Sequence, residues 1–119
     1  MTTPRQIAEA FSGHRFHEAY PALAPDVRWT SPGQFTLTGR AAVLDACETT
    51  LRELAAGTMQ FERFVVVAED DAAAVDAVGR YVDADGEVSL VSSCDVYEFR
   101  DGAVTSITSY TVEVDPSDL

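Results

Sequence analysis

One acidic residue, Asp95, stands inside a stretch whose pattern is otherwise typical of a buried strand, Cys94 to Gly102 (CDVYEFRDG). Successive side chains of a strand point to opposite faces, so every second residue shares a face. The face that carries Asp95 also carries Ser89, Val91, Ser93, Tyr97 and Phe99. A bulge at Ser92-Ser93 would shift this register. A carboxyl group on such a face is a candidate for acid–base or anchoring chemistry.

Asp101 is the second acid of this stretch, in the sequence Arg100-Asp101-Gly102. An aspartate in a turn can bond nearby backbone and tolerates the turn geometry. We therefore assign Asp101 to the turn and keep Asp95 as the candidate for chemistry.

Two histidines, His14 and His17, are three residues apart at the start of a predicted helix. This spacing can place both imidazoles on one side of a helix. A metal ion would need further ligands, and the neighbouring sequence supplies no convincing set, so we expect neither a metal nor a cofactor. His14 is assigned to a capping or surface role. His17 lies closer to Phe16 and Tyr20 and is a candidate general base at a pocket mouth.

The composition is that of an ordinary globular protein with one domain over residues 1–119, since 46% of the residues are hydrophobic and 24% are charged. The formal net charge of −12 disfavours nucleic acid and anionic membranes as partners. No apolar run is long enough to span a bilayer and the N-terminus lacks a signal-peptide core, so we expect a cytoplasmic location. Cys47 and Cys94 are interpreted as buried thiols.

Helical patterns come first along the chain. Thr3-Pro4-Arg5-Gln6 has the spacing of a capping box and predicts a short helix that stops at Gly13. Phe16 to Leu23 has helical period and predicts a second helix, closed by a proline break. Gly39 to Ala56 predicts the longest helix.

Strand patterns dominate the remainder. Asp26 to Ser31 alternates and predicts a short strand at a sheet edge. Four longer strands are predicted at Met59–Ala68, Ala73–Asp83, Glu87–Phe99 and Ala103–Val114. The acidic or glycine turns between them favour an antiparallel meander. Helices first and strands last predict an α+β fold, with a curved antiparallel sheet that wraps around the long helix as a cone and a pocket at its mouth, closed by the first helices.

Three motifs in this order resemble the nuclear transport factor 2-like superfamily, in its SnoaL-like polyketide cyclase branch. They are APDVRW at residues 24–29, LTGRAAV at 37–43 and CDVYEFRDGAV at 94–104. The resemblance covers almost the whole chain and implies the cone-shaped fold, an apolar ligand pocket and a homodimer.

Ketosteroid isomerase, a member of this superfamily, uses an aspartate base, a tyrosine and a protonated aspartate. Laid by motif onto this chain, the base falls at Ser31, the tyrosine near Ile7 and the protonated aspartate at Asp95. The Arg-x-Asp pair of limonene-type epoxide hydrolases corresponds to Arg80-Tyr81-Val82, and the polyketide cyclase aspartate falls near Thr108 and Ser109. Asp95 alone is retained from these acids.

The resemblance places Asp95 inside the cone, where loss of hydration would raise its pKa and make it an acid or a hydrogen-bond donor. The alternative is that a backbone N–H, a serine or Arg80 holds Asp95 and that it organises the core. The residues expected to contact a ligand are Trp29, Ser31, Tyr97, Phe99 and Ser109. By the family pattern, Ile107 and Thr111 are also expected to line the cavity and Tyr110 to lie on the outer face.

Two functional hypotheses follow. The first is a pocket for an apolar polyketide-, steroid- or isoprenoid-like molecule, with Asp95 as polar anchor. If the protein is catalytic, a cofactor-independent proton transfer, cyclisation or dehydration is expected, with Asp95 as acid and His17 or a bound water as base. The second is a non-catalytic member that binds a ligand or another protein.

Overall fold

The structure, a computed structural model, describes residues 2–115 and residue 117. Its first helix, α1 (Pro4–Ser12), begins with the predicted capping box, in which Thr3 and Gln6 exchange side-chain and backbone hydrogen bonds. Ile7, Ala8 and Phe11 form its buried face. The capping residues therefore fix where α1 starts, and its apolar face fixes which side meets the sheet.

The predicted second helix is shorter than its pattern indicated. α2 (Phe16–Ala19) is followed by a 3₁₀ helix, η1 (Tyr20–Ala22), and the chain then enters β1 at Leu23. Pro21 accounts for the change, because a proline inside an α-helix lacks the N–H donor and clashes with the carbonyl one turn earlier.

The first strand, β1 (Leu23–Ser31), is longer than predicted and is not at the edge of the sheet. It pairs antiparallel with β2 (Phe35–Thr38) and parallel with β6 (Ala103–Val114). β2 was not predicted, although Pro32-Gly33 is followed there by a short alternating run. β2 is the true edge strand.

The remaining elements match the prediction closely. The long helix is α3 (Arg40–Ala55), and the four strands of the meander are β3 (Thr58–Ala68), β4 (Ala72–Val82), β5 (Val88–Arg100) and β6 (Ala103–Val114). The six-stranded sheet has the order β2-β1-β6-β5-β4-β3, and the meander is antiparallel as predicted. β5 pairs continuously through Ser92 and Ser93, and the irregularity lies between Glu98 and Phe99 instead.

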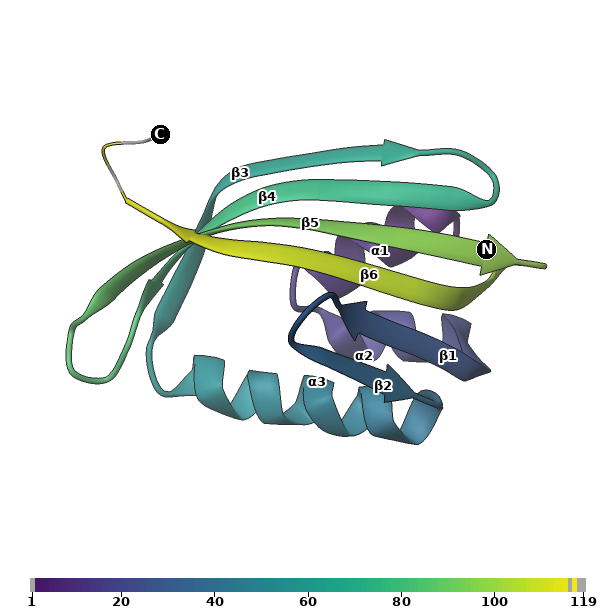
Figure 1. The fold of residues 1–119 in the computed structure, drawn as a ribbon, viewed down its shortest axis with the longest axis horizontal. Coiled ribbons are helices and arrows are strands. Elements are labelled where there is room, and N and C mark those ends of the chain that lie inside the picture. Colours follow the sequence, from purple (N-terminus) through teal and green to yellow (C-terminus); the bar gives the residue numbers. More distant parts are fainter. Residues whose placement is uncertain (1, 116, 118–119) are drawn as a thin grey trace.

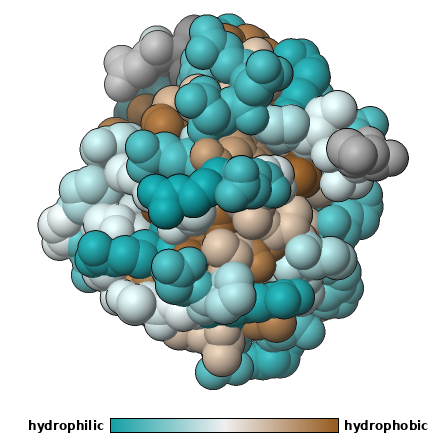
Figure 2. All heavy atoms as spheres, turned by 90° about the vertical axis from the view of Figure 1, so that its right-hand side faces the viewer, coloured by the Kyte–Doolittle hydropathy of each residue, from teal (hydrophilic) through white to brown (hydrophobic). Residues whose placement is uncertain are grey.

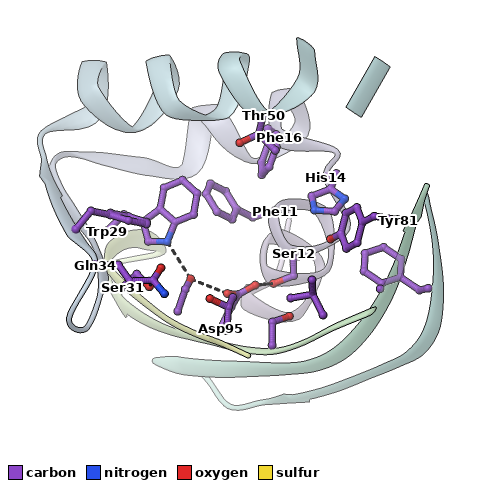
Figure 3. Close-up of a pocket in the computed structure, with 17 residues that line it drawn as sticks. Phe11, Ser12, His14, Phe16, Trp29, Ser31, Gln34, Thr50, Tyr81 and Asp95 are labelled. Atoms are coloured by element: carbon purple, nitrogen blue, oxygen red, sulfur yellow. Dashed lines mark hydrogen bonds between the residues drawn. The ribbon is translucent and has the colours of Figure 1, made fainter. Parts of the chain in front are cut away.

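The curved sheet and the helices form an open shell. α1 lies against the inner side of the sheet, and α3 runs along the open side, facing the strands across the interior (Figures 1 and 3). The core fills this interior with residues such as Phe11, Val43, Tyr97 and Ile107. This arrangement confirms the predicted α+β fold, with one parallel strand pair in an otherwise antiparallel sheet.

The surface is mainly polar. At the end of the molecule drawn in Figure 2, hydrophilic residues form most of the surface and apolar ones show chiefly near its centre. The outer side of the meander exposes several large apolar side chains: Val65, Val67, Val88, Tyr110 and Val112. Within the described part of the chain, no helix has both the length and the apolar character to cross a membrane.

Candidate functional site

A pocket of about 200 Å³ opens between α1, α3 and the inner face of the sheet. Its walls are mainly aromatic, contributed by Phe11, Phe16, Trp29, Phe35, Phe61 and Tyr81. Its polar lining consists of hydroxyl and amide groups, the imidazole of His14 and one carboxylate, Asp95. Asp95 lies on the sheet, with Trp29 on one side of the pocket and His14 and Tyr81 on the other (Figure 3).

Both oxygens of the Asp95 carboxylate accept a hydrogen bond from a serine. Ser12 Oγ donates to Oδ2 at 2.7 Å and Ser109 Oγ donates to Oδ1 at 2.6 Å. The alternation of β5 and β6 makes this possible, because Asp95 is paired with Ser109 and both point inward. Ser12 arrives from the last turn of α1, 83 residues away in sequence.

Each serine is itself bonded to a second donor. The indole Nε1 of Trp29 donates to Ser109 Oγ at 2.9 Å, and the hydroxyl of Tyr97 lies 2.5 Å from Ser12 Oγ. An indole N–H can only donate, so Ser109 has its own proton free for Asp95. Because Ser12 uses its single proton toward Asp95, Tyr97 donates to Ser12. Two chains of donors therefore converge on one carboxylate.

This pattern assigns Asp95 the role of an acceptor. A carboxylate has roughly four acceptor positions, and the two serines fill two of them, so positions remain for a ligand. The structure thus supports one part of the alternative that a serine holds Asp95. No arginine forms an ion pair with Asp95 among the described residues.

Tyr97 is the last donor in one of these two hydrogen-bond chains, and it lies inside the core. Its side chain is fully buried, and burial, followed by the charge of Asp95, raises its pKa well above the ordinary value. The phenol therefore stays protonated and remains a donor. Tyr97 acts on Asp95 through Ser12 and does not line the pocket.

His14 reaches the pocket through an unusual backbone conformation. α1 ends in a Schellman-type cap, in which the N–H of His14 bonds to Phe11 O and that of Arg15 bonds to Ala10 O. The residue at the centre of this cap needs a left-handed conformation and is commonly glycine. Here it is His14, with φ of 64°, while Gly13 precedes it where an added Cβ would meet Glu9 O at 2.7 Å.

The His14 ring stacks on Phe61, with centroids 5.6 Å apart, and lies near Tyr81. Burial lowers the pKa of His14, and the charge of Asp95 opposes that shift only in part. The pocket wall therefore carries a neutral imidazole. His14 does lie in the cap of α1, as expected, but its side chain lines the pocket and is not a surface group.

Tyr81 contributes a phenol on the same side as His14. Burial, followed by the charge of Asp95, raises its pKa, so this hydroxyl is a neutral donor. Its ring lies over Gly79, where an added Cβ would approach the ring to 2.7 Å. The missing side chain at Gly79 thus leaves space for the ring in the pocket wall.

The structure gathers four of the predicted site residues. Asp95, Trp29, Ser31 and Ser109 all line the pocket. Ser31 lies at the end of β1 and donates to Gln34 Oε1 at 3.1 Å. The position that resembles the base of ketosteroid isomerase therefore presents a hydroxyl group to the pocket.

Three predicted residues lie elsewhere. Tyr97 and Phe99 share the inward face of β5 but are packed in the core behind the pocket. His17 is exposed on α2, and its Nε2 lies 2.9 Å from Glu48 Oε2 on α3. The helical turn between Phe16 and Tyr20 directs His17 outward, so the structure does not bring it to Asp95.

Phe11, Ser12, His14 and Tyr81 were not predicted as pocket residues. His14 and Ser12 carried no local signal, because the role of His14 depends on the cap of α1 and on Phe61, and that of Ser12 depends on a strand distant in sequence. Among the described residues, no group of three or more His, Cys, Asp or Glu side chains could hold a metal ion.

The comparisons with known proteins agree with this architecture. An NTF2-like protein of unknown function from Cytophaga hutchinsonii is similar over 89% of this chain and 93% of its own, with 29% identity and a TM-score of 0.77. A proposed polyketide cyclase from Xanthomonas campestris pv. campestris shares 23% identity, covering 94% and 87% of the two chains with a TM-score of 0.68.

An LEH-like epoxide hydrolase of M. tuberculosis shares 19% identity, covering 91% and 81% of the two chains with a TM-score of 0.62. Identities this low show the common fold alone. No curated protein matches the sequence. The family model of the SnoaL-like domain matches residues 5–107, most of the chain. The chain therefore belongs to the SnoaL-like family and has an NTF2-like fold.

Proposed function

We propose that this protein binds a small, largely apolar molecule in the pocket, with the Asp95 carboxylate as the hydrogen-bond acceptor that orients it. The observation that carries the proposal is the convergence of Ser12 and Ser109 on Asp95 in an aromatic-walled pocket. Asp95 is half-buried, and its two hydrogen bonds hold the carboxylate while leaving acceptor positions for a ligand.

The pocket volume sets the ligand size. An apolar cavity of about 150 Å³ admits a benzene molecule. The volume of about 200 Å³ therefore suits a ligand of one or two rings, or an isoprenoid of similar bulk. Of the polyketide-, steroid- and isoprenoid-like ligands that the family resemblance implies, the smaller ones fit best, and a four-ring steroid would extend beyond the pocket.

The binding proposal can be tested with a thermal-shift screen of small ring compounds. A ligand that binds the folded state alone raises its apparent stability. We expect several compounds to stabilise the wild type and to lose this effect in Asp95→Asn. In that variant Oδ1 can still accept from Ser109, and the amide can donate to Ser12, whose hydroxyl can turn toward Tyr97.

Asp101→Asn is the matched control, because it removes the same charge at an exposed turn. It should keep the wild-type shifts. Identical ligand profiles for wild type and Asp95→Asn would contradict the role of Asp95.

Turnover by proton transfer is a second candidate function, favoured by the presence of Asp95, His14 and Tyr81 in one pocket. Asp95 would accept a proton from a carbon next to a ligand carbonyl, and the neutral Tyr81 phenol would donate a hydrogen bond to the resulting enolate oxygen. Asp95 is the base in this scheme, and His17, the base expected from the sequence, is exposed away from the pocket. The test is deuterium exchange into 2-tetralone, a two-ring enolisable ketone, followed by NMR in D₂O.

Wild-type protein should accelerate the exchange and Asp95→Asn should not. Equal exchange rates with both proteins would remove the catalytic candidate while leaving ligand binding intact.

We also propose that two copies pair through the outer side of the meander. The exposed side chains of Val65 and Val67 on β3 and of Tyr110 and Val112 on β6 support this proposal, since large apolar side chains exposed on one side of a sheet commonly mark an interface. Light scattering should give the mass of a dimer, and Val67→Glu should shift it toward the monomer. A monomeric wild type at the highest soluble concentration would contradict the pairing.

A further inference from the structure

The pocket has a charge that nothing on its walls balances. Asp95 is its single carboxylate, and the residues that line it include no arginine. Lysine is absent from the whole sequence. Arg5, Arg15 and Arg63 form ion pairs with other acids away from the pocket. The lining among the described residues therefore carries a net negative charge.

His14 is the one lining residue that could supply a positive charge. Its ring is stacked on Phe61 and half-buried, and that burial favours the neutral imidazole. Near neutral pH the charge of Asp95 is thus countered by hydrogen bonds alone. The formal net charge of −12 adds a field that attracts cations to the protein as a whole.

The aromatic walls suit the same kind of partner. Aromatic rings have a negative face and a positive edge, and cations bind over the face. Phe11 lies at the centre of the wall, in edge contact with Phe16 and Trp29 at centroid distances of 5.0 and 5.1 Å. An organic cation can place its charge near Asp95 and its hydrocarbon groups against these rings.

The water that a ligand displaces from Asp95 favours a cationic donor over a neutral hydrocarbon. A ligand that fills the pocket removes water from the remaining acceptor positions of Asp95. A neutral hydrocarbon leaves these positions unpaired, which is costly, whereas a cationic donor replaces the water with a charge-assisted hydrogen bond. The advantage of the cation grows as the pocket becomes drier.

We propose that the natural ligand of this pocket is an organic cation, a protonated amine on a body of one or two apolar rings. This inference rests on the proposed function, since it names the ligand class of the same site. It narrows the role of Asp95 to that of the countercharge.

The test uses three probes of nearly equal size: benzylammonium, benzyl alcohol and benzoate. Their affinities are measured by NMR titration against wild type, Asp95→Asn and Asp101→Asn at low salt and pH 7. Benzylammonium should bind the wild type about tenfold more tightly than benzyl alcohol, the difference expected of one charge-assisted hydrogen bond, and benzoate should bind least. The preference should disappear in Asp95→Asn and remain in Asp101→Asn.

The outcomes separate this inference from the proposed function. If benzyl alcohol binds the wild type as tightly as benzylammonium, the cation inference is overturned and the neutral-ligand pocket remains. If none of the three probes binds, both proposals are overturned. A cation preference that persists in Asp95→Asn would assign the effect to the overall charge of the protein and would also overturn the inference. The wild-type comparison decides the question even if Asp95→Asn fails to fold.

Discussion

Two carboxylates of the protein, Glu48 and Asp95, each accept from a hydroxyl group and lie near a histidine, but one is on the surface and the other is in the pocket. Glu48 Oε2 accepts from Tyr20 and lies within hydrogen-bond distance of His17 on the surface, at 2.9 Å in each case. Asp95 accepts from Ser12 and Ser109 inside the pocket, with Tyr97 behind one serine and His14 nearby. The residue types alone do not distinguish a site from a surface cluster. Enclosure by aromatic walls does.

Solvent access explains the difference in expected energetics. The side chains of His17 and Glu48 are 68% and 45% exposed, so water can replace either partner. Ser12 and Ser109 are 8% and 5% exposed, and their donors have few alternative acceptors. Equivalent substitutions in the two clusters should therefore have unequal effects.

The largest effect is expected from deletion of each carboxylate. Asp95→Ala leaves two buried hydroxyl donors without their acceptor and should lower the free energy of unfolding by about 2 kcal/mol. Glu48→Ala breaks an exposed cluster and should cost much less, because water can replace either partner. Urea unfolding of both variants measures the difference. Equal losses would mean that the Asp95 network is as replaceable by water as the surface cluster.

The next comparison uses the two tyrosines. Tyr97→Phe removes the buried donor to Ser12 and should cost about 1 kcal/mol, the usual net value of a buried hydrogen bond. Tyr20→Phe removes the donor to Glu48 at the surface and should have a smaller effect. Unfolding midpoints of the two variants, at unchanged denaturant slope, provide the test. A larger loss in Tyr20→Phe would reverse the ranking of the clusters.

Substitution by glycine should have opposite effects on stability at His14 and at His17. At His14 the backbone is left-handed, so His14→Gly should be more stable than His14→Ala by about 1 kcal/mol. At His17, inside α2, glycine should be less stable than alanine by a similar amount. Thermal melts of the four variants check the sign at each position. The same sign at both would show that His14 does not experience backbone strain.

The smallest effect is a pH dependence specific to His14. Its folded pKa lies below the unfolded value of about 6.5, so the unfolded state binds more protons in this range. The contribution of His14 to the free energy of unfolding is therefore fully present above about pH 6.5 and is lost as the pH falls toward the folded pKa. His14→Asn should flatten this slope below about pH 6.5. An unchanged slope in His14→Asn would contradict the burial of a neutral imidazole.

Much of the fold followed from local patterns. The capping box at Thr3, the long helix and the four alternating runs each specify an element through nearby residues. The errors arose where the outcome depends on distant partners. β1 lies inside the sheet because β2 and β6 pair with its two sides. Pro21 ends the α-helix that periodicity alone predicted to continue to Leu23.

The site was predictable in part for the same reason. Asp95 was identifiable as a polar residue in an apolar strand pattern, and Ser109 followed from the family resemblance. His14 was not, because its role depends on the cap of α1 and on Phe61 of β3. Tyr97 and Phe99 lie on the inward face of β5, as strand alternation predicts. Their depth behind the pocket depends on how the helices and the sheet pack, which the local sequence does not show.

A crystal structure with the tightest-binding ring compound bound tests the central claim most directly. The account predicts that a donor atom of the ligand lies within about 3.2 Å of an Asp95 carboxylate oxygen, while Ser12 and Ser109 keep their hydrogen bonds to it. A ligand bound on the outer face of the sheet, or one in the pocket that leaves Asp95 without contact, would contradict the assignment of Asp95 as the polar anchor.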